Sequence, residues 1–319
     1  MRPPPVWFGF VGQANAVRRV RTYADGALER GESMPVTIIR GDCGSGKTEL
    51  PKAIARCFGT EVHRMVGCKE LTVVEYARTV TSCKPFAILH GDEAHAISRE
   101  VQEWLLRLID RRVIPKTEQK DGARAARVVG ECPAPKVGLV LSTNLSGRLL
   151  RALRSRCMVE VTLRPYPPRE LFYIARQMAA RRSIVVTPQA ATLIAKSAAG
   201  LPRNVELLIE GLTYRYTTAP TDGFTVEHVR EILDIHQIDR WGRSEDQQEY
   251  MRFLHRLGGD GVSLTTLVHG MRVDETELRE RVEPYLIHQG WVTIESGGRT
   301  LTHTGRAIVE ADYAELPKS

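Results

Sequence analysis

The stretch Gly41-Asp42-Cys43-Gly44-Ser45-Gly46-Lys47-Thr48 constrains the fold of this chain more than any other segment. It has the form G-x-x-x-x-G-K-T, which is typical of a loop that binds the phosphates of a nucleotide. The apolar run 36–39 before it predicts a short buried strand, and residues 49–56 after it predict a helix. Because this pattern is convincing only between a strand and a helix, its context predicts an α/β fold in which residues 41–48 form a phosphate loop.

The residue types of the phosphate loop suit the binding of ATP and Mg²⁺. Glycines let the backbone approach the phosphates closely, so that its N–H groups and the start of the following helix face the negative charge. Lys47 is expected to reach the β- and γ-phosphates, and the hydroxyl of Thr48 is expected to hold Mg²⁺. The nucleotide-binding residues expected in this segment are Gly41, Cys43, Gly44, Ser45, Gly46, Lys47, Thr48 and Glu49.

A second apolar run, residues 86–89, leads to the acidic pair Asp92 and Glu93. The run predicts a buried parallel strand, and ligands collect at the carboxyl ends of such strands. Asp92 is then expected to orient Mg²⁺ through its water shell, and Glu93 to polarise the attacking water as a general base. The alternative is an acidic helix start without a catalytic role, which a phosphate loop in the same chain disfavours. His95 is expected to be an ordinary helical residue.

A third apolar run, residues 137–141, predicts another buried strand that ends in polar residues. Asn144 at this end is expected to hydrogen-bond either the γ-phosphate or the attacking water. Arginines cluster in the segment 149–157 that follows, and a basic helix on the protein surface is sufficient to explain them.

The composition fits a cytoplasmic globular protein of two or three domains. The chain has 319 residues, of which 42% are apolar and 26% charged, and no apolar run approaches the length of a transmembrane helix. The first residues lack the apolar segment of a signal peptide, and the six cysteines show no paired C-x-x-C spacing. The formal net charge of +7 is compatible with a polyanionic partner such as nucleic acid.

The proline-rich stretch 164–168 marks a change of composition and a domain boundary. Helical patterns follow over residues 169–180, 188–198, 202–216 and 226–236. Beyond Trp241, three helical patterns and a hairpin that turns at 296–299 predict a winged helix-turn-helix. We therefore expect an α/β core (1–163), a helical lid domain (164–240) and a winged-helix DNA-binding domain (241–319).

Residues 113–129 predict a β-hairpin with its tip near Asp121-Gly122. The charges of this hairpin fit a solvated surface as well as they fit a face that meets a protein partner or DNA. The residues alone leave both interpretations open.

Taken together, these segments resemble RuvB, the AAA+ motor family of bacterial Holliday-junction branch migration, over nearly the whole chain. The following motifs carry the resemblance and are shared by AAA+ proteins in general: Phe10-Val11-Gly12-Gln13, the phosphate loop, Asp92-Glu93-Ala94-His95, Ser142-Thr143-Asn144, Leu153-Arg154-Ser155-Arg156 and Gly200-Leu201-Pro202-Arg203. A further run is specific to RuvB-like chains, Val282-Glu283-Pro284-Tyr285-Leu286-Ile287-His288-Gln289-Gly290-Trp291. The resemblance implies an AAA+ core with a parallel sheet, and an ATP-hydrolysing ring, expected to be a hexamer, that translocates on duplex or four-way-junction DNA.

The resemblance also implies roles for single residues. Val11 would contribute to the nucleotide site, and Asn144 would be the sensor-1 residue. Arg156 would be an arginine finger, reaching the γ-phosphate of a neighbouring subunit. Arg203 would be the sensor-2 arginine, which ties the lid to the nucleotide of its own chain. Arg299 would stand at the wing, where the family touches the DNA backbone.

Some residues depart from the family pattern. Cys43 and Ser45 replace the usual Pro and Leu, and His90-Gly91 stands where bulky apolar residues are the norm. The hairpin is implied to dock on a junction-binding adaptor, but its arms lack most of the isoleucines used on RuvA, which puts RuvA itself in doubt. Two other functions stay open: an ATP-switched DNA-binding or recruitment factor without translocation, and a clamp-loader-like remodeller, whose arginine motif Ser155-Arg156-Cys157 also matches.

Overall fold

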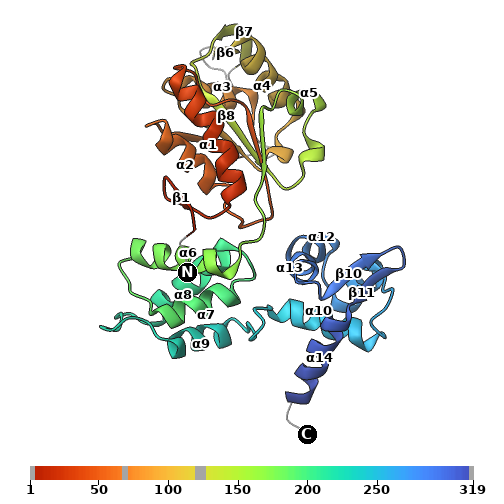
Figure 1. The fold of residues 1–319 in the computed structure, drawn as a ribbon. Helices are drawn as coiled ribbons and strands as arrows, with labels where there is room; N and C mark the ends of the chain where they lie inside the picture. Colours follow the sequence, from red (N-terminus) through yellow and green to blue (C-terminus); the bar gives the residue numbers. More distant parts are fainter. Residues whose placement is uncertain (1–3, 67–70, 119–126, 316–319) are drawn as a thin grey trace. The chain divides into compact units, whose positions relative to one another are not determined.

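The computed structural model describes residues 4–66, 71–118 and 127–315. It divides into two compact units, Met1–Tyr166 and Pro167–Ser319 (Figure 1). In the part of the chain that the structure describes, no helix combines the length and the apolar character needed to cross a membrane.

The first unit is built on a five-stranded parallel sheet, as the sequence predicts. The strand order is β4-β5-β8-β3-β9, so the strand before the phosphate loop, β3, lies between β8 and β9. The strands are β3 (Thr37–Arg40), β4 (Val62–Val66), β5 (Ile88–Asp92), β8 (Gly138–Thr143) and β9 (Val159–Thr162). Because all neighbouring strands pair in parallel, their carboxyl ends form one edge of the sheet.

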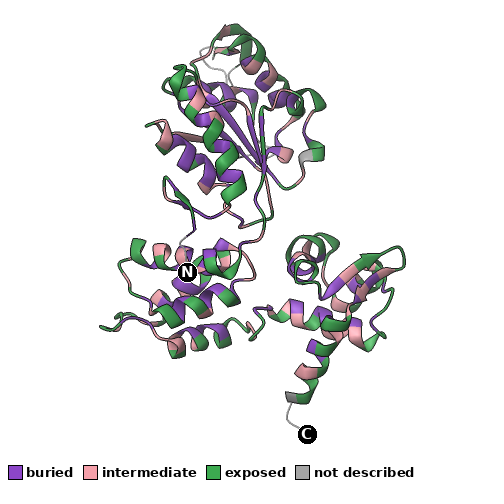
Figure 2. Ribbon diagram, viewed as in Figure 1, coloured by how far each residue is buried: buried purple, intermediate pink, exposed green. Residues whose placement is uncertain are grey.

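Helices cover both faces of this sheet, and the buried residues gather on the strands between them (Figure 2). On one face, α1 (Ala14–Glu29) and α2 (Glu49–Cys57) share a core cluster with the strands. On the other face, α3 (Val73–Thr81), α4 (Arg99–Arg111) and the short α5 (Arg151–Arg154) do the same. The three layers explain why the strands are apolar on both sides.

The predicted hairpin is present as β6 (Val113–Glu118) and β7 (Arg127–Pro133), which pair antiparallel. Its predicted tip, Asp121-Gly122, lies outside the described residues. A second, smaller pair joins β1 (Val6–Trp7) to β2 (Phe10–Val11) beside α2.

The second unit begins with the helices that the sequence predicts, and prolines occupy the first turns of three of them. These helices are α6 (Pro168–Arg181), α7 (Pro188–Ser197), α8 (Pro202–Arg215) and α9 (Val226–Ile235). The elements of the winged helix follow: α10 (Glu245–Arg256), α11 (Leu264–Met271), α12 (Glu275–Glu277), η3 (Leu278–Val282), α13 (Glu283–His288), β10 (Val292–Glu295) and β11 (Gly298–Leu301). The last helix, α14 (His303–Glu315), was not predicted.

One buried ion cluster fastens the two ends of the winged-helix segment. Arg243 is fully buried, and its guanidinium binds carboxylates that lie before and far after it in the chain. Its Nε atom donates to Asp239 at 2.7 Å, and its Nη2 atom donates to both oxygens of Asp312 at 2.9 and 2.7 Å. A buried guanidinium is tolerated only with such partners, so α14 is tied to the segment that enters α10.

Candidate functional site

The carboxyl edge of the sheet gathers three of the predicted site segments (Figure 1). The phosphate loop leaves β3 after Arg40, Asp92 ends β5, and Asn144 directly follows β8. Strand β8 lies between β3 and β5, so its end stands between the phosphate loop and the acidic pair. Asn144 is exposed at this edge.

Backbone geometry explains the glycines of the phosphate loop. Gly44 and Gly46 have φ angles of +79° and +96°, which residues with side chains adopt rarely. A Cβ atom at Gly46 would also lie 3.5 Å from the ring of Phe10 in β2 and 3.4 Å from the hydroxyl of Tyr166. The loop is therefore wound tightly against β2, the strand that contains Val11, itself buried.

The side chains of the loop fit a bound nucleotide and its metal ion. Lys47 is only 6% exposed, and its ammonium donates to the carbonyls of Gly41 and Asp42, both at 2.8 Å. The hydroxyl of Ser45 is buried without a hydrogen-bond partner among the described residues. Thr48 does not use its hydroxyl to cap α2. A polyanion at this loop would give the Lys47 ammonium and the Ser45 hydroxyl strong acceptors.

Asp92 is held from two sides at the end of β5. Its side chain is 7% exposed, its Oδ1 atom accepts the Glu93 N–H at 3.1 Å, and its Oδ2 atom binds the guanidinium of Arg64. Arg64 comes from β4, the neighbouring strand, and was not among the predicted site residues. The sequence gives no signal that Arg64 belongs to the site. Its proximity to Asp92 becomes visible only once β4 is seen to pair with β5.

Glu93 adopts a left-handed backbone conformation, with φ +48°, and its side chain is 43% exposed. Its carboxylate lies 3.4 Å from Nδ1 of His95, and the same nitrogen lies 3.2 Å from the hydroxyl of Thr143 at the end of β8. His95 is helical, as expected, but its ring has polar contacts that the sequence did not predict. It lies in the short 3₁₀ helix η1 (Ala94–Ala96) and links the Glu93 carboxylate to β8.

The unusual pair His90-Gly91 has a packing explanation. His90 is 1% exposed; its Nε2 atom lies 2.8 Å from the hydroxyl of Ser142, which donates to the carbonyl of Lys47 at 3.2 Å. Burial lowers the pKa of His90 to about 4, so its ring is neutral near pH 7. A Cβ atom at Gly91 would lie 2.7 Å from Cδ2 of Leu141, so glycine permits close contact between β5 and β8. The pair thus connects β5, β8 and the phosphate loop.

Arg156 lies at the opposite edge of the sheet, before the amino end of β9. Its Nε and Nη2 atoms donate to the two carboxylate oxygens of Asp110 in α4, at 2.7 and 2.8 Å. Its Nη1 atom donates to the carbonyl of Ala152 at 2.9 Å. The Asp110 carboxylate raises the pKa of Arg156, and the Arg156 guanidinium lowers the pKa of Asp110.

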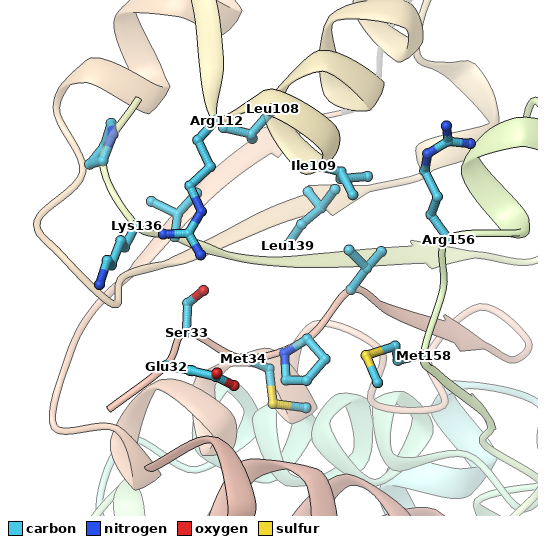
Figure 3. A pocket seen from close by; sticks show the side chains of 14 residues that line it. Glu32, Ser33, Met34, Leu108, Ile109, Arg112, Lys136, Leu139, Arg156 and Met158 are labelled. Atoms are coloured by element: carbon cyan, nitrogen blue, oxygen red, sulfur yellow. The ribbon is translucent and has the colours of Figure 1, made fainter. Parts of the chain in front are cut away.

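A cavity of about 370 Å³ adjoins Arg156 at this amino edge. Figure 3 shows Arg112, Lys136 and Glu32 on one side of the cavity and Arg156 with Met158 on the other. The residues before β3, β8 and β9 line it, so it lies across the sheet from the phosphate loop and is not the nucleotide site.

Arg203 lies in the second unit, in the first turn of α8, where its side chain is exposed. Its assignment as the sensor-2 residue stays a prediction.

The structure corrects the expected position of Arg299. The residue does not stand at the exposed turn of the wing but inside β11, and its side chain is only 10% exposed. Its Nε and Nη2 atoms donate to Oε1 and Oε2 of Glu283, at 2.8 and 3.3 Å, and Tyr250 donates to the same carboxylate. The turn falls at Ser296-Gly297, and the guanidinium that was expected on DNA is used inside the domain.

Comparisons with known proteins agree with this architecture. A model of the Holliday junction DNA helicase RuvB P-loop domain matches residues 1–163, and a model of the RuvB C-terminal winged helix domain matches residues 240–310. The solved Thermotoga maritima RuvB, described as a Holliday junction branch migration motor, is 26% identical, with a TM-score of 0.79 over 96% of this chain and 97% of that chain.

Two further solved structures, one similar and one more distant, were also matched. A variant of Thermotoga maritima RuvB is 25% identical, with a TM-score of 0.81 over 99% of this chain and 100% of that chain. NtrX from Brucella abortus is 18% identical, with a TM-score of 0.51 over 86% of this chain and 69% of that chain, and shares the fold alone. The matches to both ends of the chain show that it belongs to the RuvB family of Holliday junction DNA helicases.

Proposed function

We propose that this chain hydrolyses ATP with Mg²⁺ at the carboxyl edge of its sheet and uses the turnover to move on branched duplex DNA. The observation that carries the proposal is the placement of the phosphate loop, the acidic pair and Asn144 at one edge, in a chain whose two ends match RuvB domains. The division of residues 164–319 into a helical lid and a winged-helix domain belongs to the same proposal.

Each side chain at this edge has a distinct task. Lys47 binds the β- and γ-phosphates in place of the carbonyls of Gly41 and Asp42 that it now contacts. Thr48 and Asp92 would hold Mg²⁺, which would supply positive charge to the phosphates. Glu93 orients and deprotonates the attacking water, and Asn144 hydrogen-bonds the same water or the γ-phosphate.

Arg156 acts on the nucleotide of a neighbouring subunit. Its position at the amino edge puts the length of a strand between it and its own phosphate loop, about 13 Å for four residues. It cannot serve the site of its own chain, which supports a ring, expected to be a hexamer, with each site completed by the next subunit. Arg203 contributes from the lid to the site of its own chain.

A junction-binding adaptor is expected to dock on the β6–β7 hairpin. Val128 and Val129 of β7 are 42% and 52% exposed, although they are apolar. Exposed apolar side chains on a protruding hairpin fit a protein partner better than DNA. The rival functions, a recruitment factor without translocation and a clamp-loader-like remodeller, are not favoured, because the winged helix and the P-loop domain both match RuvB.

The test compares ATPase rates with no DNA, single-stranded DNA, duplex DNA and a four-way junction, alongside a strand-exchange assay on the junction. We expect DNA to stimulate ATP turnover. We also expect ATP-dependent movement of the branch point to separate the four-way junction into duplex products. The Lys47→Ala variant is the control for contaminating ATPase activity. ATP-dependent binding to DNA without movement of the branch point would refute the motor and favour a switch.

A further inference from the structure

The strand β4 carries a cation that faces the magnesium-binding carboxylate. In the pairing of β4 with β5, Arg64 lies beside His90, and Val66 lies beside Asp92. Residues two apart on a strand share a face, so Arg64 projects from the same face as His90 and Asp92. Its side chain is long enough to reach Asp92, and its Nη2 atom contacts the Oδ2 atom.

This contact compensates a buried charge. Asp92 is 7% exposed, and a carboxylate that is removed from water needs a cation or several donors to remain ionised. The Glu93 N–H serves its Oδ1 atom, and Arg64 serves its Oδ2 atom. Two other cations of this unit are engaged elsewhere: Lys47 binds loop carbonyls, and Lys52 binds Glu49 at 2.5 Å.

The pair can also exchange its cation. The side chain of Arg64 is 51% exposed, so the guanidinium can move into solvent when another cation takes its place at Asp92. The guanidinium and Mg²⁺ are both cations attracted to the Asp92 carboxylate. The guanidinium occupies one acceptor site of Oδ2, and its positive charge opposes the approach of a second cation.

We propose that Arg64 is a positioning residue that neutralises Asp92 before Mg²⁺ arrives and competes with the ion for this carboxylate. The inference rests on the proposed function, because it takes Asp92 as the magnesium ligand. Two effects follow. Without Mg²⁺, Arg64 shields the nucleotide phosphates from the charge of Asp92. With Mg²⁺, Arg64 raises the concentration of the ion that is needed to saturate the site.

The experiment measures the affinity of a fluorescent, non-hydrolysable ATP analogue during titration with Mg²⁺, starting from a chelator. Arg64→Ala should bind the analogue more weakly than wild type in chelator, and should reach half-saturation at about fivefold less Mg²⁺, the factor that corresponds to about 1 kcal/mol. Arg64→Lys, which keeps the charge, should stay close to wild type. Arg99→Ala, which removes an exposed cation from the same unit, is the matched control and should match wild type.

The Asp92→Asn background separates this role from a direct contact with phosphate. If Arg64 acts through Asp92, Arg64→Ala should have little effect on affinity in chelator once residue 92 is neutral. An equal loss of affinity in both backgrounds, or the same Mg²⁺ dependence in Arg64→Ala and wild type, would overturn the inference. If wild type binds no nucleotide even with Mg²⁺, the proposed function itself fails. Should Arg64→Ala misfold by circular dichroism, Arg64→Gln replaces it.

Discussion

Arg156 and Asp110 form a two-point ion pair, with Nε to Oδ1 at 2.7 Å and Nη2 to Oδ2 at 2.8 Å. The side chains are 36% and 42% exposed, so the pair lies at the surface and can open. An arginine that binds the phosphate of a neighbouring subunit must first leave this carboxylate. The pair would therefore hold the proposed arginine finger within its own subunit while no neighbour is present.

Removal of Asp110 should free Arg156 to bind the nucleotide of a neighbouring subunit. We expect Asp110→Ala to reach half of its maximal ATPase rate at a lower protein concentration than wild type, by a factor below about ten, because surface pairs are weak. Glu103→Ala on the same helix, which breaks the pair with Arg99, is the control. A higher concentration requirement would instead show that Asp110 orients the finger productively.

Glu93→Gln should separate nucleotide binding from hydrolysis. The amide keeps the size of the side chain but cannot accept the proton of water, whereas the phosphate loop is untouched. The variant should bind ATP with near-normal affinity and turn it over at least about a hundredfold more slowly, as single-turnover assays would show. Near-normal turnover would remove Glu93 from the role of base.

Arg156→Ala should also be inactive by itself, but it should complement Glu93→Gln. In a mixed ring, some interfaces join an intact Glu93 to an intact Arg156 from the next subunit. Mixtures at several ratios should therefore recover part of the turnover that both pure variants lack. Failure to recover at every ratio, with mixed assembly confirmed by co-purification, would argue against action in trans.

Cys43 provides a footprint of nucleotide binding that does not depend on turnover. Its side chain is exposed in the phosphate loop, whereas Cys83 is buried and burial raises the pKa of that thiol to about 11. At pH 7.5 a maleimide reagent should modify Cys43 rapidly and Cys83 slowly, because the thiolate is the reactive form. ATP with Mg²⁺ should slow the modification of Cys43 at least about tenfold, by covering the loop. Peptide mapping by mass spectrometry measures both rates.

Arg299→Ala should lower the stability of the winged helix rather than weaken a DNA contact. Removal of one partner from a buried pair leaves Glu283, 3% exposed, without its cation, which costs about 3 kcal/mol or more. Chemical denaturation of the variant should show this loss. Arg279→Ala, which breaks the exposed pair with Glu275, should change stability by less than about 1 kcal/mol. If Arg299→Ala is stable but binds DNA with a shallower salt dependence, the original DNA assignment returns.

The sequence was sufficient to predict those parts of the site that depend on local chemistry. The glycine loop needs unusual φ angles and a following helix, so its residues alone predict the β3–loop–α2 unit. The helical pattern over residues 202–216 likewise predicted α8, which has a proline in its first turn.

Side-chain contacts between neighbouring strands could not be predicted from the sequence, because they depend on which strands pair and in which register. The pair of Arg64 with Asp92 exists only because β4 pairs with β5, and the contact of His90 with Ser142 exists only because β5 pairs with β8. The turn of the wing was predicted with Arg299 inside it. One small difference in where β11 begins moves that side chain from solvent to the core.

The burial of Arg243 limits how far the winged helix can be treated as a transferable module. Its two carboxylate partners, Asp239 and Asp312, lie just outside the 240–310 segment that matches the RuvB winged-helix model. A gene fusion cut at those limits would retain the guanidinium in the core and discard both of its counter-ions, at a cost of several kcal/mol. A transferable winged-helix segment must therefore extend beyond residues 240–310 at both ends. Any exchange of winged helices between relatives must transfer Arg243, Asp239 and Asp312 together.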